Sequence, residues 1–260
     1  LPLRNPSRAP RLPDCEPRPF SYGDFELARE ALQGVDALFM VSAAESPTRE
    51  QEHLTLVRAA QTAGIQHLVY LSFAEARPDS TFTLARTHAA TEEAIRRSTM
   101  KYTFVRDNFY SELIARLADD EGVICGPAEQ GRVACVAQRD VAQAVANIMA
   151  DIAAGGTQHQ GRTYTLTGSQ ALSMEDVARI LTTCTGRPHR FHNETMTEAF
   201  ASRRAAYPDT PDWENAAWVS TYTAIAKGEL AQVSQDLPRL IGREPLTFEQ
   251  VVRELANPGA

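Results

Sequence analysis

The sequence predicts an α/β fold in which a doubly wound parallel sheet carries helices on both faces, with a smaller, mostly helical region at the C-terminal end. Compact apolar runs alternate with segments of helical spacing, and two of these runs end in small polar residues, at Val41-Ser42 and Leu71-Ser72. Nearly continuous apolar runs are typical of parallel strands that are buried on both faces. Strands that alternate with helices in this way form a parallel sheet through crossover connections.

The composition is that of an ordinary globular protein. The chain has 260 residues, of which 43% are hydrophobic and 23% are charged, and its net charge is −7. A negative net charge argues against a nucleic-acid-binding surface, because phosphate contacts need clustered Lys and Arg. The longest apolar runs are about eight residues long, far below the ~20 that a membrane-spanning helix needs. We therefore expect no membrane association and no nucleic-acid partner.

The four cysteines, Cys15, Cys125, Cys135 and Cys184, form no C-x-x-C pair and have no His at metal-ligand spacing. Such thiols are typical of a reducing compartment, so we expect a cytoplasmic protein without a metal site.

The N-terminal elements are expected in the following order. Residues 1–6 read as the end of a second strand, and the proline-rich stretch after them reads as an extended loop because proline supplies no amide donor. The next segments are a helix over 26–32, a buried strand over 35–42, a helix over 49–63 that stops at Gly64, and a buried strand over 67–72.

The remaining elements begin with a helix over 84–98, a strand over 102–106 and a helix over 141–152. After Gly155-Gly156 the pattern changes to a short strand over 164–167, a helix that Ser173 caps, and helical spacing from Thr195 onward. We therefore expect a dinucleotide-binding domain over 1–155 and a substrate-binding lid over 156–260.

No G-x-G-x-x-G spacing occurs among the 14 glycines. That motif normally follows the first strand of a dinucleotide-binding domain and opens its first helix. We therefore expect this chain to lack the first strand and the Gly-rich loop. Whether those residues are missing in nature or only from this sequence stays open.

Several segments resemble the NmrA-like group of atypical short-chain dehydrogenases, over nearly the whole chain and in the expected order. His88-x-x-Thr91-Glu92 looks like the group's H-x-x-T-E helix, and residues 102–112 look like its Y-T-x-L-R-N-x-x-Y-x-E segment. Similar likenesses occur at residues 34–42, 64–72, 139–142, 222–231 and 240–245. The resemblance implies a Rossmann-like fold that binds NAD(P), as in NADPH-dependent quinone reductases and triphenylmethane reductases. The same superfamily contains redox-sensing regulators.

Arg4 is the leading candidate for cofactor binding. A guanidinium at the tip of a second strand can bind the 2′-phosphate of NADP, with Asn5 beside it, so NADPH is expected in preference to NADH. A solvated arginine in a loop is the alternative. Tyr22 aligns with a family segment that lies against the adenine, although a core tyrosine fits equally well.

Two further groups of cofactor contacts are expected at the strand ends. Ligands of open parallel sheets lie beyond the carboxyl ends of the strands. The predicted contacts there are Val41, Ser42, Ala43, Leu71 and Ser72, where small side chains let a dinucleotide approach the backbone.

The segment from Leu84 to His88 departs from the usual short-chain dehydrogenase motif. Typical members carry Tyr-x-x-x-Lys here, and the spacing places Leu84 at the Tyr position and His88 at the Lys position. A leucine cannot donate a proton, so the usual alcohol-dehydrogenase chemistry is not supported. His88 could contact the ribose or a substrate oxygen and deliver a proton, because its unperturbed pKa is about 6.5. A structural histidine is the alternative.

Phe73, Asn108, Phe109 and Tyr110 follow strands and are the expected substrate contacts, with the aromatic rings offering flat apolar faces. Core packing between sheet and lid is equally consistent. Two functions remain open. One is hydride transfer from NAD(P)H to a quinone-like or other planar small molecule. The other is a non-catalytic NADP-binding sensor that acts through a protein partner. A homodimer is possible with either.

Overall fold

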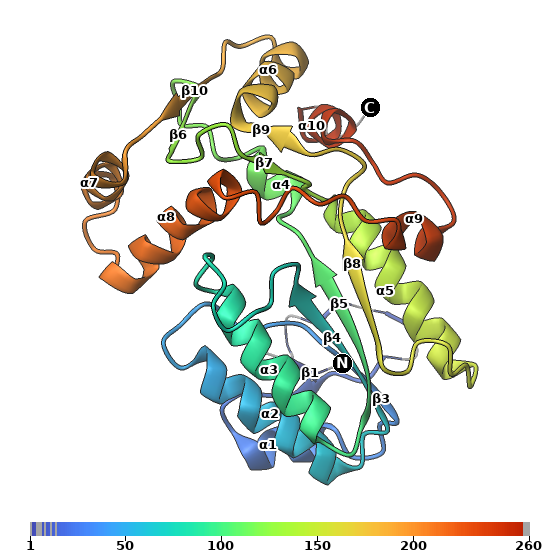
Figure 1. Ribbon diagram of the computed structural model, residues 1–260. Coiled ribbons are helices and arrows are strands. Elements are labelled where there is room, and N and C mark those ends of the chain that lie inside the picture. The colour runs from blue at the N-terminus through green and yellow to red at the C-terminus, as the bar shows by residue number, and fades with distance from the viewer. Residues whose placement is uncertain (1, 4–6, 8, 11, 14, 257–260) are drawn as a thin grey trace. The chain divides into compact units, whose positions relative to one another are not determined.

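The computed structural model describes residues 2–3, 7, 9–10, 12–13 and 15–256 (Figure 1). The chain forms two compact units that interleave along the sequence. Unit 1 comprises Leu1–Ser72, Thr87–Val105 and Met149–Thr163, and unit 2 comprises Phe73–Arg86, Arg106–Ile148 and Tyr164–Ala260. The functional division at residue 155 stays a prediction.

The predicted α/β fold with a parallel sheet is confirmed. A four-stranded sheet has the order β3-β4-β5-β8, with β3 at Ala37–Met40, β4 at His67–Phe73, β5 at Lys101–Asp107 and β8 at Arg162–Leu166. β3 and β4 are parallel, with Ala37 opposite His67 and Met40 opposite Tyr70. Two short strands, β1 (Pro2–Leu3) and β2 (Arg18–Pro19), also pair in parallel.

Three helices accompany the strands of unit 1. They are α1 (Phe25–Ala31), α2 (Arg49–Ala63) and α3 (Ala85–Arg97). Asp24 caps α1 by accepting the Leu27 amide proton at 3.0 Å. α2 ends at Gly64, whose φ of 89° is a left-handed conformation that favours glycine. One continuous core joins these helices to the strands, and its fully buried members include Leu32, Met40, Leu56, Leu68, Tyr70, Ile95 and Phe104.

Unit 2 also contains two short strand pairs that were not predicted from the sequence. β6 (Val123–Gly126) pairs in parallel with β10 (Arg190–Asn193), and β7 (Arg132–Val133) pairs antiparallel with β9 (Leu172–Ser173). Its helices are α4 (Ser111–Ile114), α5 (Gln138–Ala153, whose last turns lie in unit 1), α6 (Met174–Thr185), α7 (Met196–Ala206), α8 (Asp212–Ala226), α9 (Asp236–Ile241) and α10 (Phe248–Ala256).

Local capping and close packing fix unit 2. The predicted cap at Ser173 is present as a capping box with Asp176, and Thr195 forms a second one with Glu198. Gly131 lies so close to α8 that an added Cβ would meet the Ile225 carbonyl oxygen at 2.0 Å. The unit has its own core, which includes Phe73, Phe109, Ile114, Val177 and Tyr222.

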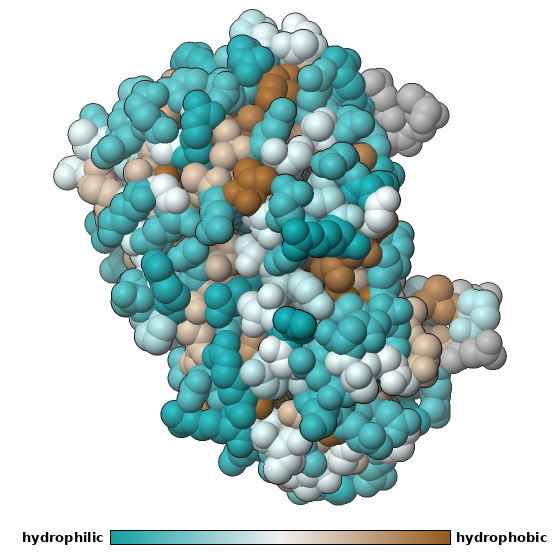
Figure 2. Space-filling view, turned by 45° about the vertical axis from the view of Figure 1, so that its right-hand side comes forward, coloured by the Kyte–Doolittle hydropathy of each residue, from teal (hydrophilic) through white to brown (hydrophobic). Residues whose placement is uncertain are grey.

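The surface is mainly hydrophilic, with hydrophobic side chains in small patches on the face that Figure 2 shows. Among the described residues, no helix combines the length and the apolar character that crossing a membrane would require.

Candidate functional site

The carboxyl ends of β3 and β4 bring together five of the predicted cofactor contacts in unit 1. Val41 follows β3 and is 46% exposed, and Ala43 is buried two residues later. The Ser42 hydroxyl donates to the Leu71 carbonyl oxygen at 3.4 Å, which joins the two strand ends. Ser72 is fully buried instead. At this edge Val41 is exposed and Ser42 and Leu71 are half-buried, whereas the Ser72 side chain is buried.

Tyr22 lies at the same edge. Its hydroxyl donates to the Val41 carbonyl oxygen, and its ring packs against Phe20 at a centroid distance of 5.0 Å. The ring also lies 6.0 Å from the ring of His53. Tyr22 is only half-buried, so one part of the side chain braces the edge while another part stays accessible. Arg4 and Asn5, the predicted contacts for the adenosine phosphate, lie outside the described residues.

Ser72 is tied to α3 through Glu92. The Ser72 hydroxyl donates to one Glu92 carboxylate oxygen at 2.6 Å, and Arg96 donates to the other at 2.7 Å. Glu92 is fully buried, so both bonds offset the cost of placing a charge inside the protein. These contacts fix α3 against β4 and thereby set the position of His88 one turn earlier in the helix.

His88 is 8% exposed, and both of its ring nitrogens are engaged. Arg49 lies 2.9 Å from Nε2, and the Tyr70 hydroxyl lies 3.0 Å from Nδ1. A guanidinium can only donate hydrogen bonds, so Arg49 donates to Nε2 of His88. The proton of the neutral imidazole is then on Nδ1, which donates it to the Tyr70 hydroxyl oxygen. His88 is therefore held as a neutral imidazole. Its predicted contact with cofactor or substrate stays a prediction.

Arg49 is the first residue of α2 and is only 5% exposed. Within the described part of the chain its Nε has no hydrogen-bond partner. Burial lowers its pKa, an effect that Tyr70, Glu45 and Tyr22 oppose. Arg49 donates to a neutral histidine, so its positive charge is not neutralised by that partner.

His53 is a member of this cluster that sequence reasoning missed. It is fully buried, and the Ala43 amide donates to its Nε2 at 2.9 Å. The other nitrogen, Nδ1, therefore carries the proton and donates to the Thr91 hydroxyl at 2.8 Å, and that hydroxyl in turn donates to the Thr87 carbonyl oxygen at 2.7 Å. Burial and the nearby Arg49 charge lower the pKa of His53 to about 3. The backbone turn after β3 is thus fixed by a histidine that stays neutral.

The predicted substrate contacts belong to unit 2. Phe73 and Phe109 pack with Phe82 in a triangle of rings, with centroid distances of 5.0 to 5.1 Å. All three rings are buried, so they build a rigid apolar wall within the core of the unit. Asn108 is also buried, and its amide donates to the Leu230 carbonyl oxygen at 3.0 Å. Tyr110 is half-buried.

Asp107 is a second residue that sequence reasoning missed. It is the last residue of β5 and is only 7% exposed. Burial raises the pKa of its carboxyl to about 7, an effect that the bonds from Tyr110 and from its own backbone oppose. Perturbed pKa values cluster at functional sites, so Asp107 is added to the candidate residues.

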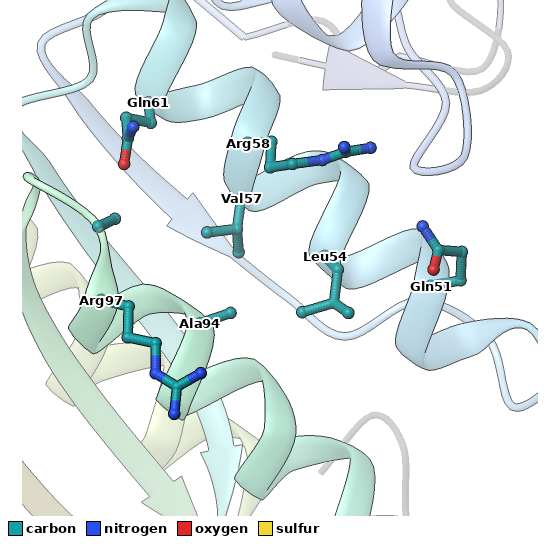
Figure 3. A pocket seen from close by; sticks show the side chains of 8 residues that line it. Gln51, Leu54, Val57, Arg58, Gln61, Ala94 and Arg97 are labelled. Carbon is teal, nitrogen blue, oxygen red and sulfur yellow. The ribbon is translucent and has the colours of Figure 1, made fainter.

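One surface groove lies away from these residues. It has a volume of about 400 Å³ and runs between α2 and α3, where Leu54, Val57 and Ala94 form its apolar lining and Arg58, Arg97 and two glutamines supply its polar lining (Figure 3). None of the predicted cofactor or substrate contacts lines it.

Comparison with known proteins gives a consistent result. The family model described as the NmrA-like family matches residues 21–214. The chain is 30% identical over 260 residues to quinone oxidoreductase 2 of Escherichia coli strain K12, covering 98% of this chain and 88% of that protein. The structure matches a crystal structure of the NADPH-dependent quinone oxidoreductase from E. coli in complex with NADPH with a TM-score of 0.88, at 30% identity over 98% of this chain and 89% of that one. It matches triphenylmethane reductase of Citrobacter sp. complexed with NADP(H) with a TM-score of 0.81, at 28% identity over 93% of this chain and 84% of that one.

Proposed function

Because the chain belongs to the NmrA-like family, we propose that it is an NAD(P)H-dependent reductase that transfers a hydride to a quinone or another planar, electron-poor small molecule. The observation that carries the proposal is similarity over nearly the whole chain to a quinone oxidoreductase whose crystal structure is described as containing NADPH. A bound nicotinamide would supply the hydride, and the protein would bind, orient and exclude water.

The residues of unit 1 fit a dinucleotide at the carboxyl edge of β3 and β4. Exposed Val41 and half-buried Ser42 leave the backbone there open to close approach, and buried Arg49 adds positive charge nearby. The residues proposed to hold the cofactor are Arg4, Asn5, Tyr22, Val41, Ser42, Ala43, Leu71, Ser72 and His88. Arg4 is the basis for proposing that NADPH binds better than NADH.

Quinones suit a site that lacks the usual tyrosine acid. Leu84 stands at that position and cannot release a proton, so the substrate must be one whose reduction does not depend on that residue. The predicted substrate contacts are Phe73, Asn108, Phe109 and Tyr110, of which half-buried Tyr110 is the most accessible. The cytoplasm is the proposed compartment, since the structure contains four free cysteines and reducing conditions suit them.

A steady-state assay of NADPH oxidation with a simple benzoquinone tests the proposal. Turnover well above the uncatalysed rate is expected. Tight dinucleotide binding without turnover on quinones, azo compounds or triphenylmethane dyes would contradict it and would favour a cofactor-binding regulator.

The cofactor preference has a separate test. Thermal-shift measurements should show a larger rise in melting temperature with NADPH than with NADH, because only NADPH offers a 2′-phosphate to Arg4. Arg4→Ala should remove most of the difference, whereas Arg97→Ala, which changes an exposed arginine of α3, should leave it intact. Equal shifts with both cofactors in the unmodified protein would refute the role of Arg4.

A further inference from the structure

The turn after β3 carries three of the predicted cofactor contacts, and side chains of other elements hold it in place. Pairing of β3 with β4 ends at Met40, and residues 41–44 belong to no strand or helix. The hydrogen bonds of the strand ladder therefore stop just before the predicted contacts Val41, Ser42 and Ala43. The backbone of this turn depends on hydrogen bonds that come from elsewhere in unit 1.

The two ends of the turn are bound by different elements. The Val41 carbonyl oxygen accepts from the Tyr22 hydroxyl. Two residues later, the Ala43 amide donates to Nε2 of His53 in α2 at 2.9 Å. Ala43 is 9% exposed and His53 is fully buried, so water does not compete for this second bond. A buried amide is costly to leave unpaired, and the bond therefore ties the position of the turn to α2.

The tautomer of His53 is determined at both ring nitrogens. Nε2 accepts the Ala43 proton, so it carries no proton of its own. The Thr91 hydroxyl has a single proton and donates it to the Thr87 carbonyl oxygen at 2.7 Å. It can therefore only accept from Nδ1 of His53, which lies 2.8 Å away. Thr91 in α3 thus keeps the lone pair of Nε2 directed at the turn.

Aromatic rings surround the same histidine. The ring of Tyr22 lies 6.0 Å from the His53 ring, and the ring of Tyr70 lies 6.1 Å from it at an interplanar angle of 80°. Tyr22 is also the residue that binds the Val41 carbonyl oxygen. His53 therefore supports the turn twice, directly at Ala43 and through the Tyr22 ring at Val41. All of these residues belong to unit 1.

We propose that His53 is a positioning residue for the nicotinamide dinucleotide, an inference that rests on the proposed binding of the cofactor at the carboxyl edge of β3 and β4. Its side chain is fully buried, so it acts through the Ala43 amide and not by direct contact. A backbone that is fixed before binding does not have to be ordered when the ligand arrives, which raises affinity. The affinity for the cofactor thus depends on a hydrogen-bond acceptor at the position of Nε2.

The route through Ala43 limits which quantities change. The turn supports binding of the cofactor and supplies no group to the hydride transfer, so the KM for NADPH depends on His53 whereas kcat at saturating NADPH does not. NADPH and NADH differ only in the 2′-phosphate, which is assigned to Arg4. Loss of the His53 contact therefore weakens the binding of both dinucleotides by the same factor.

Two replacements separate the two ring nitrogens of His53. The side-chain amide of Gln ends about as far from the backbone as Nε2 and can accept from Ala43, whereas that of Asn ends about where Nδ1 does and reaches only Thr91. In calorimetric titrations, His53→Asn should raise the Kd for NADPH roughly 10-fold, because the buried amide loses its acceptor. His53→Gln should restore most of the affinity. The control His192→Asn makes the same substitution at an exposed histidine of β10 and should leave the Kd unchanged.

Two further readouts would not respond to a general loss of stability. With NADPH and a benzoquinone, His53→Asn should raise the KM for NADPH and keep kcat, whereas a smaller folded fraction would lower the apparent kcat instead. Proton–nitrogen correlation spectra of the ligand-free protein should show a histidine ring with its proton on Nδ1, and this signal should be missing from His53→Asn. If His53→Asn does not fold, Thr91→Val carries the test, because it removes the acceptor for Nδ1 and keeps the histidine. It should also weaken NADPH binding.

The outcomes distinguish this inference from the proposed function. If the unmodified protein binds NADPH and both His53 variants bind it equally tightly, the positioning role is wrong and the proposed function stands. Equal losses of affinity in His53→Asn and His53→Gln would show that the bond to Ala43 is not the cause, and unchanged affinity in Thr91→Val would contradict the role of the tautomer. If the unmodified protein binds neither NADPH nor NADH, the proposed function and the inference both fail.

Discussion

Replacement of His53 by Gln should change how acid affects the stability of the protein. In the folded state the pKa of His53 is lowered from 6.5 to about 3, mainly by burial and then by the Arg49 charge. The unfolded chain can bind a proton below about pH 6.5, whereas the folded protein cannot until the pH approaches 3. Stability is therefore lost as the pH falls through this window. Between about pH 7 and pH 5 the loss is roughly 1.5 pKa units at ~1.36 kcal/mol each, or about 2 kcal/mol.

Gln is the matched replacement because its amide can accept from the Ala43 amide or donate to Thr91, as the two ring nitrogens do. Urea unfolding of both proteins at several pH values between 5 and 8 measures the effect. His53→Gln should be less stable than the unmodified protein near pH 7. Between about pH 7 and pH 5, the free energy of unfolding of the unmodified protein should fall by about 2 kcal/mol more than that of the variant. Other histidines contribute equally to both proteins and cancel in the comparison. Parallel stability curves would show that His53 is not held neutral in the folded state.

Two further pairs of substitutions test the packing. Gly131→Ala should destabilise the protein by several kcal/mol in urea unfolding, because its Cβ would meet the Ile225 carbonyl oxygen at 2.0 Å. Gly186→Ala, at a left-handed cap with open space around it, should cost only about 1 kcal/mol, and equal costs would contradict the close approach. Ser72→Ala should lower the free energy of unfolding by about 1–3 kcal/mol, because it removes a hydrogen-bond donor from buried Glu92. Ser72→Thr keeps the hydroxyl and should lower it less; equal losses would show that this hydrogen bond is not the cause.

Sequence patterns predicted the larger elements well because their signals are local. The helix predicted over 49–63 has these bounds in the structure, since Gly64 supplies the left-handed stop that ends it. The strand predicted over 35–42 is shorter, at Ala37–Met40, because the apolar run continues past the point where pairing with β4 ends. β6 and β10 were not predicted as a pair. Each is four residues long, and they meet only through a pairing between distant segments.

The candidate site was predicted only in part, for a similar reason. Rules about strand ends identified Val41, Ser42, Leu71 and Ser72, but not which of these side chains face inward. His53 lies four residues after Arg49, so both side chains lie on the same face of α2. Two polar residues at this spacing on a buried helix face could have indicated a polar cluster from the sequence. Asp107 ends an apolar strand, where an acidic side chain is expensive to bury and therefore informative.

The interleaving of the two units has a consequence for biosynthesis. The last segment of unit 1, Met149–Thr163, docks through the Thr103 hydroxyl, which donates to the His159 carbonyl oxygen at 2.7 Å, and through the Gly161 amide, which donates to Tyr102. A nascent chain leaves the ribosome from its N-terminus, so two segments of unit 2, Phe73–Arg86 and Arg106–Ile148, emerge before this piece is available. During translation one edge of β5 therefore stays unpaired until synthesis has passed residue 163.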